Sequence, residues 1–407
     1  MASESIPLLE LSVWPALGCL AIWSWVASTP LFAAAELPPI PSKGRVQSID
    51  GLRGYLALGV LLHHAAIYPS FLSTGVWSAP RSRLYANLGP VSVAIFFMIT
   101  GYLFWSQLLA TDGRPGWVRL YALRVTRIAP VYLIASSAAL VVIFASSGFA
   151  LRVGSAALCQ QVVQWLSLGV VTVPDVVNGM DGAHHVIAGV AWTLRYEWRF
   201  YLALWPLAQF ARGRAVHLVF TITGFALSLS VVAFRNLHVS SANATMCVAL
   251  FFTGMLVASL RHAFPDVIAR RTLSSGIAVA GVGLALALSN PNSVPCYLLL
   301  GVAFFQFASG ADVFGLLSWR GSQRLGNISY GIYLIHGLVL WLVFHAPAVA
   351  TLTMMKSSAP YWFVVVFAGL LTISVSAVLH LLVERPGIQV GRRLTARLQQ
   401  HVSHKPA

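Results

Sequence analysis

The sequence predicts an all-α, polytopic integral membrane protein, a bundle of about 11 transmembrane helices. Composition is the first reason: 58% of the 407 residues are hydrophobic and 9% are charged, whereas soluble domains carry about 25% charged residues. The second reason is that apolar runs of about 18 to 25 residues recur from end to end, and about 20 apolar residues cross a bilayer core. A soluble globule of this length is therefore excluded.

The apolar runs define eleven expected spans, with ends placed to within several residues. They cover residues 11–35, 51–69, 88–110, 128–149, 190–211, 215–234, 244–260, 273–290, 294–311, 328–349 and 359–383. The first run is too long for the apolar region of a signal peptide, and the residues before it, "MASESIPLLE", lack the positive charge of one. We therefore expect it to be a retained span.

Basic residues predict the orientation. The net charge of +15 would suggest nucleic acid or an acidic partner in a soluble protein, but Lys and Arg also collect in the cytoplasmic loops of membrane proteins. With residue 1 outside, the cytoplasmic side holds Lys43, Arg45, Arg53, Arg114, Arg119, Arg124, Arg127, Arg212, Arg214, Arg261, Arg270, Arg271, Arg320, Arg324, Arg385, Arg392, Arg393, Arg397 and Lys405. The outside holds Arg81, Arg83, Arg152, Arg235 and Lys356. The N-terminus is thus expected outside and the C-terminus in the cytoplasm.

Three segments are expected. Residues 1–47 form an additional transmembrane helix and a cytoplasmic linker, 48–386 the membrane domain, and 387–407 a basic cytoplasmic tail on the anionic inner leaflet. The longest loop, about 150–189, contains the apolar stretch "QQVVQWLSLGVVTV", expected to lie in the outer interface or to re-enter. The scattered cysteines give no disulfide framework or zinc site: Cys19, Cys159, Cys247 and Cys296.

The span "IDGLRGYLALGVLLHHA" carries ionisable residues that are costly in lipid. Helical geometry puts Arg53 and His64 on one face, about 20° apart and about 16 Å along the axis, with His63 about 80° the other way. Ionisable groups inside spans mark functional sites by default. The alternative is that Arg53 is a topological anchor and His64 a structural hydrogen-bonding group.

A second polar group lies in "WTLRYEWRFYL", residues 192–202. Arg195 and Arg199 share a helix face, and Glu197 is rotated by about 200° from them. Glu197 should therefore find its partner on another helix, and a histidine or arginine of 51–69 would serve. The alternative is a structural buried ion pair.

Arginines also crowd the start of the span at 128–149, where Arg119, Arg124 and Arg127 could bind phosphate or simply set the topology.

An aromatic row at 327–336, "NISYGIYLIH", fans Tyr330, Tyr333 and His336 over about 120° of one helix face. Such rows line sites or simply pack helices. His184 and His185, in the long outside loop, are minor candidates for a metal or acceptor site.

At these residues the chain resembles the acyltransferase-3 family of integral membrane acyltransferases, which modify bacterial surface sugars and some small molecules. The resemblance runs from about 48 to 386 through "IDGLRG…HH", "FFMITGYLF", "RVTRIAPVYL", "WTLRYEWRFYL", "ISYGIYLIH" and "VERP". Arg53 and His64 match the family's arginine and histidine, which are separated by ten residues. Thr100 stands where serine is usual, so a hydroxyl is retained, and Glu197 matches the family's acidic residue. The sequence departs from the pattern after this acid, at Trp198 and Arg199. The family core has ten spans, so the helix at 11–35 is an addition.

The resemblance implies an O-acyltransferase of the bacterial cytoplasmic (inner) membrane that moves an acyl group, most often acetyl, from cytoplasmic acyl-CoA to a hydroxyl of a glycan or lipid-linked sugar. His64 would be general base or transient acyl carrier, because histidine titrates near neutral pH, and Glu197 would orient it. Arg53, Arg124 and Arg127 would bind the polyanionic CoA. The expected substrate-lining residues are Thr100, Trp192, Tyr330, Tyr333 and His336.

Acetyl-CoA is then a co-substrate, with no permanently bound cofactor, no metal and no nucleic-acid partner. Two alternatives remain. A proton-coupled membrane transporter would also keep intramembrane His, Glu and Arg, although the paired repeats and broken helices of many transporters are not evident in the sequence. In a scaffold protein, the buried charges would only hold the helices together.

Overall fold

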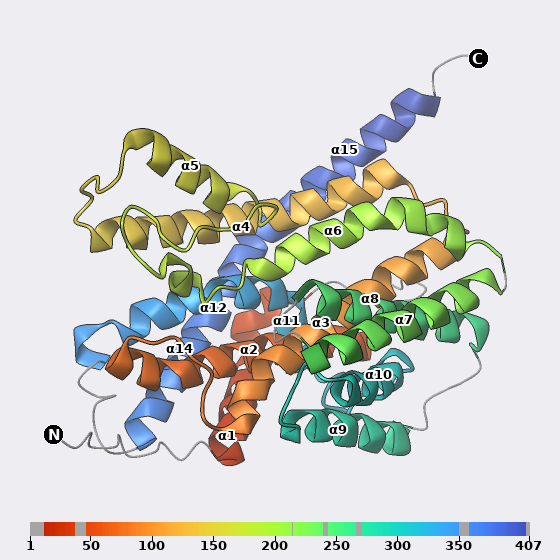
Figure 1. Ribbon diagram of the computed structural model, residues 1–407, viewed down its shortest axis with the longest axis horizontal. Coiled ribbons are helices and arrows are strands. Elements are labelled where there is room, and N and C mark those ends of the chain that lie inside the picture. The colour runs from red at the N-terminus through yellow and green to blue at the C-terminus, as the bar shows by residue number, and fades with distance from the viewer. Residues whose placement is uncertain are drawn as a thin grey trace.

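The computed structural model describes residues 12–36, 46–213, 215–238, 243–265, 271–349 and 358–403. Within these ranges the regular structure is helical and contains no strand. Figure 1 shows most of the long helices running along the longest axis of the molecule. Part of the expected 1–47 segment and these basic residues of the topology prediction lie outside the described residues: Lys43, Arg45, Arg214, Arg270, Lys356 and Lys405.

The helices follow one another along the chain with short connections. The first group is α1 Val13–Ser28, η1 Pro30–Ala35, α2 Gln47–Thr74, α3 Arg83–Ala110, α4 Trp117–Ser146, α5 Ser155–Leu166, η2 Ala183–Ile187, α6 Trp192–Leu207 and η3 Ala208–Ala211. The second group is α7 Val216–His238, α8 Asn243–Ala263, α9 Arg271–Ala287, α10 Val294–Ala308, α11 Arg320–Asn327, α12 Ser329–Phe344, α14 Ser358–Leu379, η4 His380–Glu384 and α15 Arg385–Ser403.

Six helices of the described chain are long and apolar enough to cross a membrane, or seven if the bent pair α11 and α12 is one span. This supports an integral membrane protein, but the expected count of 11 is not confirmed. Each expected span overlaps a helix. However, α1, α9 and α10 are apolar and only 15 to 17 residues long, and the 16-residue α6 contains three charged side chains.

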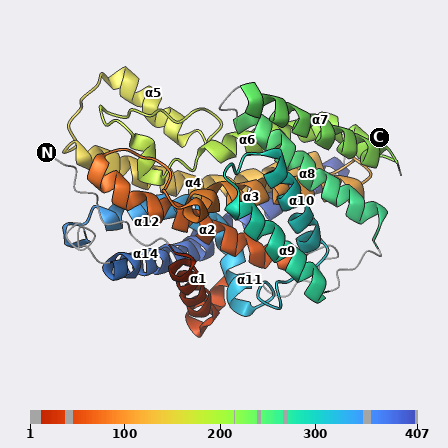
Figure 2. The ribbon, with the colours of Figure 1, turned by 60° about the horizontal axis from the view of Figure 1, so that its bottom comes forward.

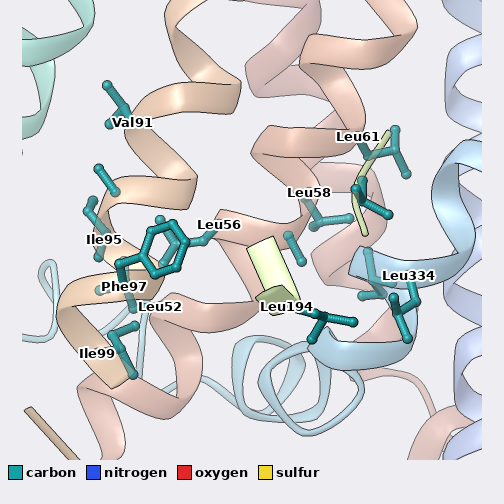
Figure 3. Close-up of a cluster of buried hydrophobic side chains, with 14 of the residues drawn as sticks. Leu52, Leu56, Leu58, Leu61, Val91, Ile95, Phe97, Ile99, Leu194 and Leu334 are labelled. Carbon is teal, nitrogen blue, oxygen red and sulfur yellow. The ribbon is translucent and has the colours of Figure 1, made fainter. Parts of the chain in front are cut away.

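The apolar core that surrounds the site lies between α2, α3, α6 and α12. Figure 3 shows this cluster of buried side chains from the four helices: Leu52, Leu56, Leu58, Leu61, Val91, Ile95, Phe97, Ile99, Leu194 and Leu334. Lipid tails are as apolar as leucine, so close packing between helices, rather than escape from water, holds such a core together. The same four helices carry most of the polar residues described below.

Glycines bring α11 against the start of α2. A Cβ atom on Gly54 would lie 2.6 Å from the Cβ of Leu325 and 2.9 Å from the backbone nitrogen of Gly326. A Cβ on Gly326 would in turn overlap the carbonyl oxygen of Asp50. Small residues permit this close approach of two helix backbones. Arg53, next to Gly54, lines the same cavity as Ser329 and Tyr330 of the first turn of α12.

The additional N-terminal helix, α1, is fixed to the domain by polar contacts. The indole of Trp23 donates to the carbonyl of Val366 on α14 at 3.0 Å. The buried Arg324 of α11 donates to the carbonyls of Ala27 and Thr29, at the end of α1. These bonds satisfy carbonyls that a helix end leaves without intrahelical partners. The helix at 11–35 is therefore integrated with α11 and α14.

The described part of the expected basic tail, residues 387–403, is helical and continues α14 through the π-helix η4. Helix α15 packs along the first half of α4, where a Cβ on Gly391 would overlap the hydroxyl of Thr126. Helices α12 and α14 lie side by side in both ribbon views (Figures 1 and 2). The first half of the apolar stretch of the long loop, residues 160–166, lies in α5, which packs on α4.

Candidate active site

A cavity of about 120 Å³ lies between α2, α3, α4, α6 and α12. It gathers polar residues that are far apart in the sequence, seven of them predicted from it: Arg53, Thr100, Arg124, Arg127, Glu197, Tyr330 and Tyr333. The remaining wall is mainly apolar, with Phe96, Phe97 and Phe104 among its residues. A mostly apolar cavity with a few convergent polar groups is the usual form of a small-molecule site.

The cavity has unbalanced positive charge. Arg127 donates from Nε to Oε1 of Glu384 at 3.0 Å, and the guanidinium of Arg124 lies 4.3 Å from the ring centre of Phe104. Among the described residues, Arg53 and Arg124 have no carboxylate oxygen within 4.0 Å. Guanidinium groups recognise phosphate through paired hydrogen bonds, so these two side chains suit an anionic ligand.

Glu197 forms its hydrogen bond within its own helix, which the sequence argument did not anticipate. Its Oε2 accepts a hydrogen bond from the hydroxyl of Tyr201 at 2.7 Å, four residues further along α6. Arg53 of the expected 51–69 span and Arg124 act on Glu197 electrostatically from other helices, although Glu197 forms no ion pair within 4.0 Å among the described residues. The sequence argument considered only the charged neighbours Arg195 and Arg199, although a tyrosine at i+4 lies within reach on the same face.

Two histidines meet next to this cavity. Nδ1 of His64 on α2 lies 2.9 Å from Nε2 of His336 on α12, with the rings stacked at 5.1 Å. Nδ1 of His336 lies 3.0 Å from the carbonyl oxygen of Ile332. His336 is fully buried and His64 half-buried. Neither residue lines the cavity itself.

His63 faces α3 instead. Its Nδ1 lies 2.7 Å from the carbonyl oxygen of Tyr85, and its ring lies where a Cβ on Gly89 would be. This separation of adjacent histidines agrees with the helix phase predicted for the span. His63 contributes to the packing of α2 on α3.

Tyr333 lies between the cavity and the histidine pair. It lines the cavity, its ring is 6.2 Å from that of His336, and its hydroxyl shares a 3.1 Å hydrogen bond with Thr193. Tyr330, one turn earlier, donates to the carbonyl of Ile128 at 2.9 Å. Trp192 does not line the cavity and packs against Phe97. The predicted aromatic row on α12 therefore reaches from the cavity, at Tyr330 and Tyr333, to the histidine pair, at His336.

Sequence reasoning missed the residues behind Arg127. Glu384 accepts from Arg127 through Oε1, and its Oε2 lies 2.8 Å from Nδ1 of His380. Both are buried in the π-helix η4. The motif "VERP" contains Glu384, and a histidine four residues before an acid is a possible signal. Thr193 and Tyr201 were also missed, because uncharged hydroxyls are common in membrane helices.

The segment between α5 and α6 brings His184 and His185 together. His184 pairs with Asp175, and the ring of His185 stacks on Trp77 at 4.8 Å. Burial, assisted by the neighbouring His184, lowers the pKa of His185 to about 4. No group of three metal-binding side chains occurs in the part of the chain that the structure describes.

An internal, arginine-lined cavity beside two paired histidines, within a helical membrane protein, is an arrangement suited to a membrane enzyme or carrier. The family model described as an acyltransferase domain matches residues 46–381. The chain therefore belongs to the acyltransferase-3 family, which confirms the resemblance, and is a membrane acyltransferase. Neither a comparison with curated proteins nor one with solved structures gives a match.

Proposed function

We propose that the protein takes an acyl group, acetyl in the simplest case, from acyl-CoA and transfers it to a hydroxyl of a glycan or lipid-linked sugar at the bacterial inner membrane. One observation carries this proposal. The cavity contains Arg53 and Arg124, which have no carboxylate partner among the described residues. Its wall also includes Tyr333, whose ring lies next to His336, the histidine that is paired with His64.

The arginines suit the donor. Coenzyme A carries several phosphate charges, and free guanidinium groups can bind them with charge-assisted hydrogen bonds. Arg53, Arg124 and Arg127 all belong to the side of the protein that the distribution of basic residues assigns to the cytoplasm, where acyl-CoA is found. The apolar part of the wall suits the pantetheine arm and the acyl chain.

His64 suits the transfer step. As general base it removes the proton of the acceptor hydroxyl, whose oxygen attacks the carbonyl carbon of the thioester. The new C–O bond forms, the C–S bond breaks, and the CoA thiolate leaves and takes up the proton. As acyl carrier, His64 would itself attack the thioester and then pass the acyl group to the hydroxyl. No hydrogen bond or ion pair joins Glu197 to His64 in the part of the chain that the structure describes, and we assign Glu197 to the wall of the donor cavity.

The test is a transfer assay with detergent-purified protein, radiolabelled acetyl-CoA and a lipid-linked glycan extract. Wild type and His63→Ala should label the extract, and His64→Ala should label it on the order of 10²-fold more slowly or worse. Equal binding of acyl-CoA and equal thermal unfolding would show that His64→Ala is folded. Unchanged labelling by His64→Ala would refute the role of this histidine. If wild type gave neither labelling nor CoA release, the proposed transfer would be wrong.

A further inference from the structure

We infer that His336 fixes the tautomer of His64, so that Nε2 of His64 is the nitrogen that takes the proton in acyl transfer. The inference rests on the proposed function for its chemistry. It rests on the hydrogen bonds of the two rings for its geometry. His336, expected from the sequence to line the substrate site, is thereby a positioning residue that acts through His64.

The chain of hydrogen bonds begins at a group that can only accept. The carbonyl oxygen of Ile332 lies 3.0 Å from Nδ1 of His336, so this nitrogen must carry hydrogen to make the bond. A neutral imidazole has one N–H, so Nε2 of His336 presents a lone pair. No carboxylate of the described chain lies within 4.0 Å of this fully buried ring to balance a second proton.

The second hydrogen bond transmits this assignment to α2. Nε2 of His336 lies 2.9 Å from Nδ1 of His64, and because Nε2 accepts, Nδ1 of His64 must donate. Nε2 of His64 is then left with its lone pair. The other tautomer of His64 would set two lone pairs against each other at this distance, at the cost of the hydrogen bond.

The arrangement matches the demands of the reaction. Nε2 of His64 accepts the proton of the acceptor hydroxyl while the C–O bond forms, and the imidazolium keeps its Nδ1–H bond to His336. When the C–S bond breaks, the thiolate sulfur receives the proton from Nε2, which restores the starting tautomer. Nε2 of the neutral, buried His336 thus orients His64, as a carboxylate orients the histidine of a hydrolase triad. The family resemblance had implied this orienting role for Glu197.

The test compares two replacements of His336. In His336→Gln the side-chain oxygen can still accept from Nδ1 of His64, whereas in His336→Leu it cannot. We expect His336→Leu to lower kcat on the order of 10²-fold with KM for acyl-CoA within about 2-fold, and His336→Gln to recover at least about 10-fold of this loss. Equal losses in both variants, or an unchanged kcat in His336→Leu, would overturn the inference.

A second measurement reads the tautomer without catalysis. In protein labelled with ¹⁵N-histidine, the two His64 signals, assigned by their loss in His64→Ala, should show a protonated Nδ1 and an unprotonated Nε2. In His336→Leu this preference should weaken. A wild-type His64 protonated at Nε2 would overturn the inference even if transfer is observed. Conversely, the expected spectrum without any transfer would refute the proposed function and leave the tautomer assignment intact.

Discussion

Arg127 and Glu384 are 257 positions apart in the sequence and share a 3.0 Å bond between Nε and Oε1. The carboxylate is held from its other side by His380, within a π-helix. Among the described residues, Arg127 is bonded through Nε, so its two terminal amino groups can turn to a ligand in the cavity. Single π-helical turns occur often at functional sites, and this one supports a cavity wall from behind.

Replacement of Glu384 tests that support. Glu384→Gln leaves Arg127 without a counter-charge and should lower the free energy of unfolding by about 1–3 kcal/mol, measured by denaturant unfolding in detergent. The double variant Arg127→Met/Glu384→Gln should be less destabilised than the sum of the single variants, because it leaves no unpaired charge. Strict additivity would contradict the pairing.

Glu36 provides the control for this experiment. It also binds an arginine, Arg324, at 2.9 Å, but its side chain is 48% exposed, whereas that of Glu384 is 2% exposed. Water can reach the Glu36 end of this pair, and the buried Arg324 keeps its bonds to the carbonyls of Ala27 and Thr29. Glu36→Gln should therefore cost less than Glu384→Gln, and the opposite order would show that burial does not set the cost.

Arg53 and Arg124, which have no carboxylate oxygen of the described residues within 4.0 Å, should control donor binding. We expect Arg53→Met and Arg124→Met each to raise KM for acyl-CoA by about 10-fold or more, because a hydrogen bond to a charged group contributes about 1.5–3 kcal/mol. Arg119→Met removes the same charge from an exposed position of α4 outside the cavity wall and should leave KM nearly unchanged. Steady-state kinetics with acyl-CoA as the varied substrate decides between these outcomes. An equal rise of KM in Arg119→Met would show that the general positive charge of the surface, and not the cavity arginines, controls donor binding.

His185 predicts a pH dependence of stability. Burial lowers its pKa from 6.5 to about 4, so between these values the unfolded chain binds more protons than the folded one. The contribution of neutral His185 to the free energy of unfolding is therefore complete above pH 6.5 and is lost as the pH falls toward 4. His185→Phe keeps a ring against Trp77 but cannot titrate, so its melting temperature should fall less over this range. Parallel curves for the two proteins would contradict the assignment; the His184–Asp175 pair is present in both.

Local geometry made part of the site predictable. Helix phase alone puts His64, and not His63, on the face of Arg53, and the structure turns His63 toward Tyr85. The all-helical fold followed from composition and apolar runs. The number of spans did not, because an apolar run in the sequence does not show where its helix ends: α10 has 15 residues, fewer than the about 20 that cross a bilayer core.

Pairing between helices was not predictable from one sequence. His336 meets His64 across 272 positions, and Glu384 meets Arg127 through the packing of η4 and α15 against α4. Such contacts depend on which helices are neighbours, and spacing along one helix contains no information about that. Glu197 is different, because Tyr201 was within reach at i+4; a hydroxyl was overlooked in favour of charged partners.

Gly54 links the sequence pattern around Arg53 to the site. A Cβ atom there would lie 2.6 Å from the Cβ of Leu325 and 2.9 Å from a backbone nitrogen, so Gly54→Ala must move α11 away from α2. Overpacking of this kind costs about 1–3 kcal/mol, and it should also lower kcat/KM because Arg53 is the adjacent residue. Gly18→Ala is the control, since a Cβ on Gly18 of α1 meets nothing within 4 Å. It should be neutral or stabilising by up to about 1 kcal/mol. If both variants unfold at the same temperature with unchanged kinetics, the close approach of α2 and α11 does not position Arg53.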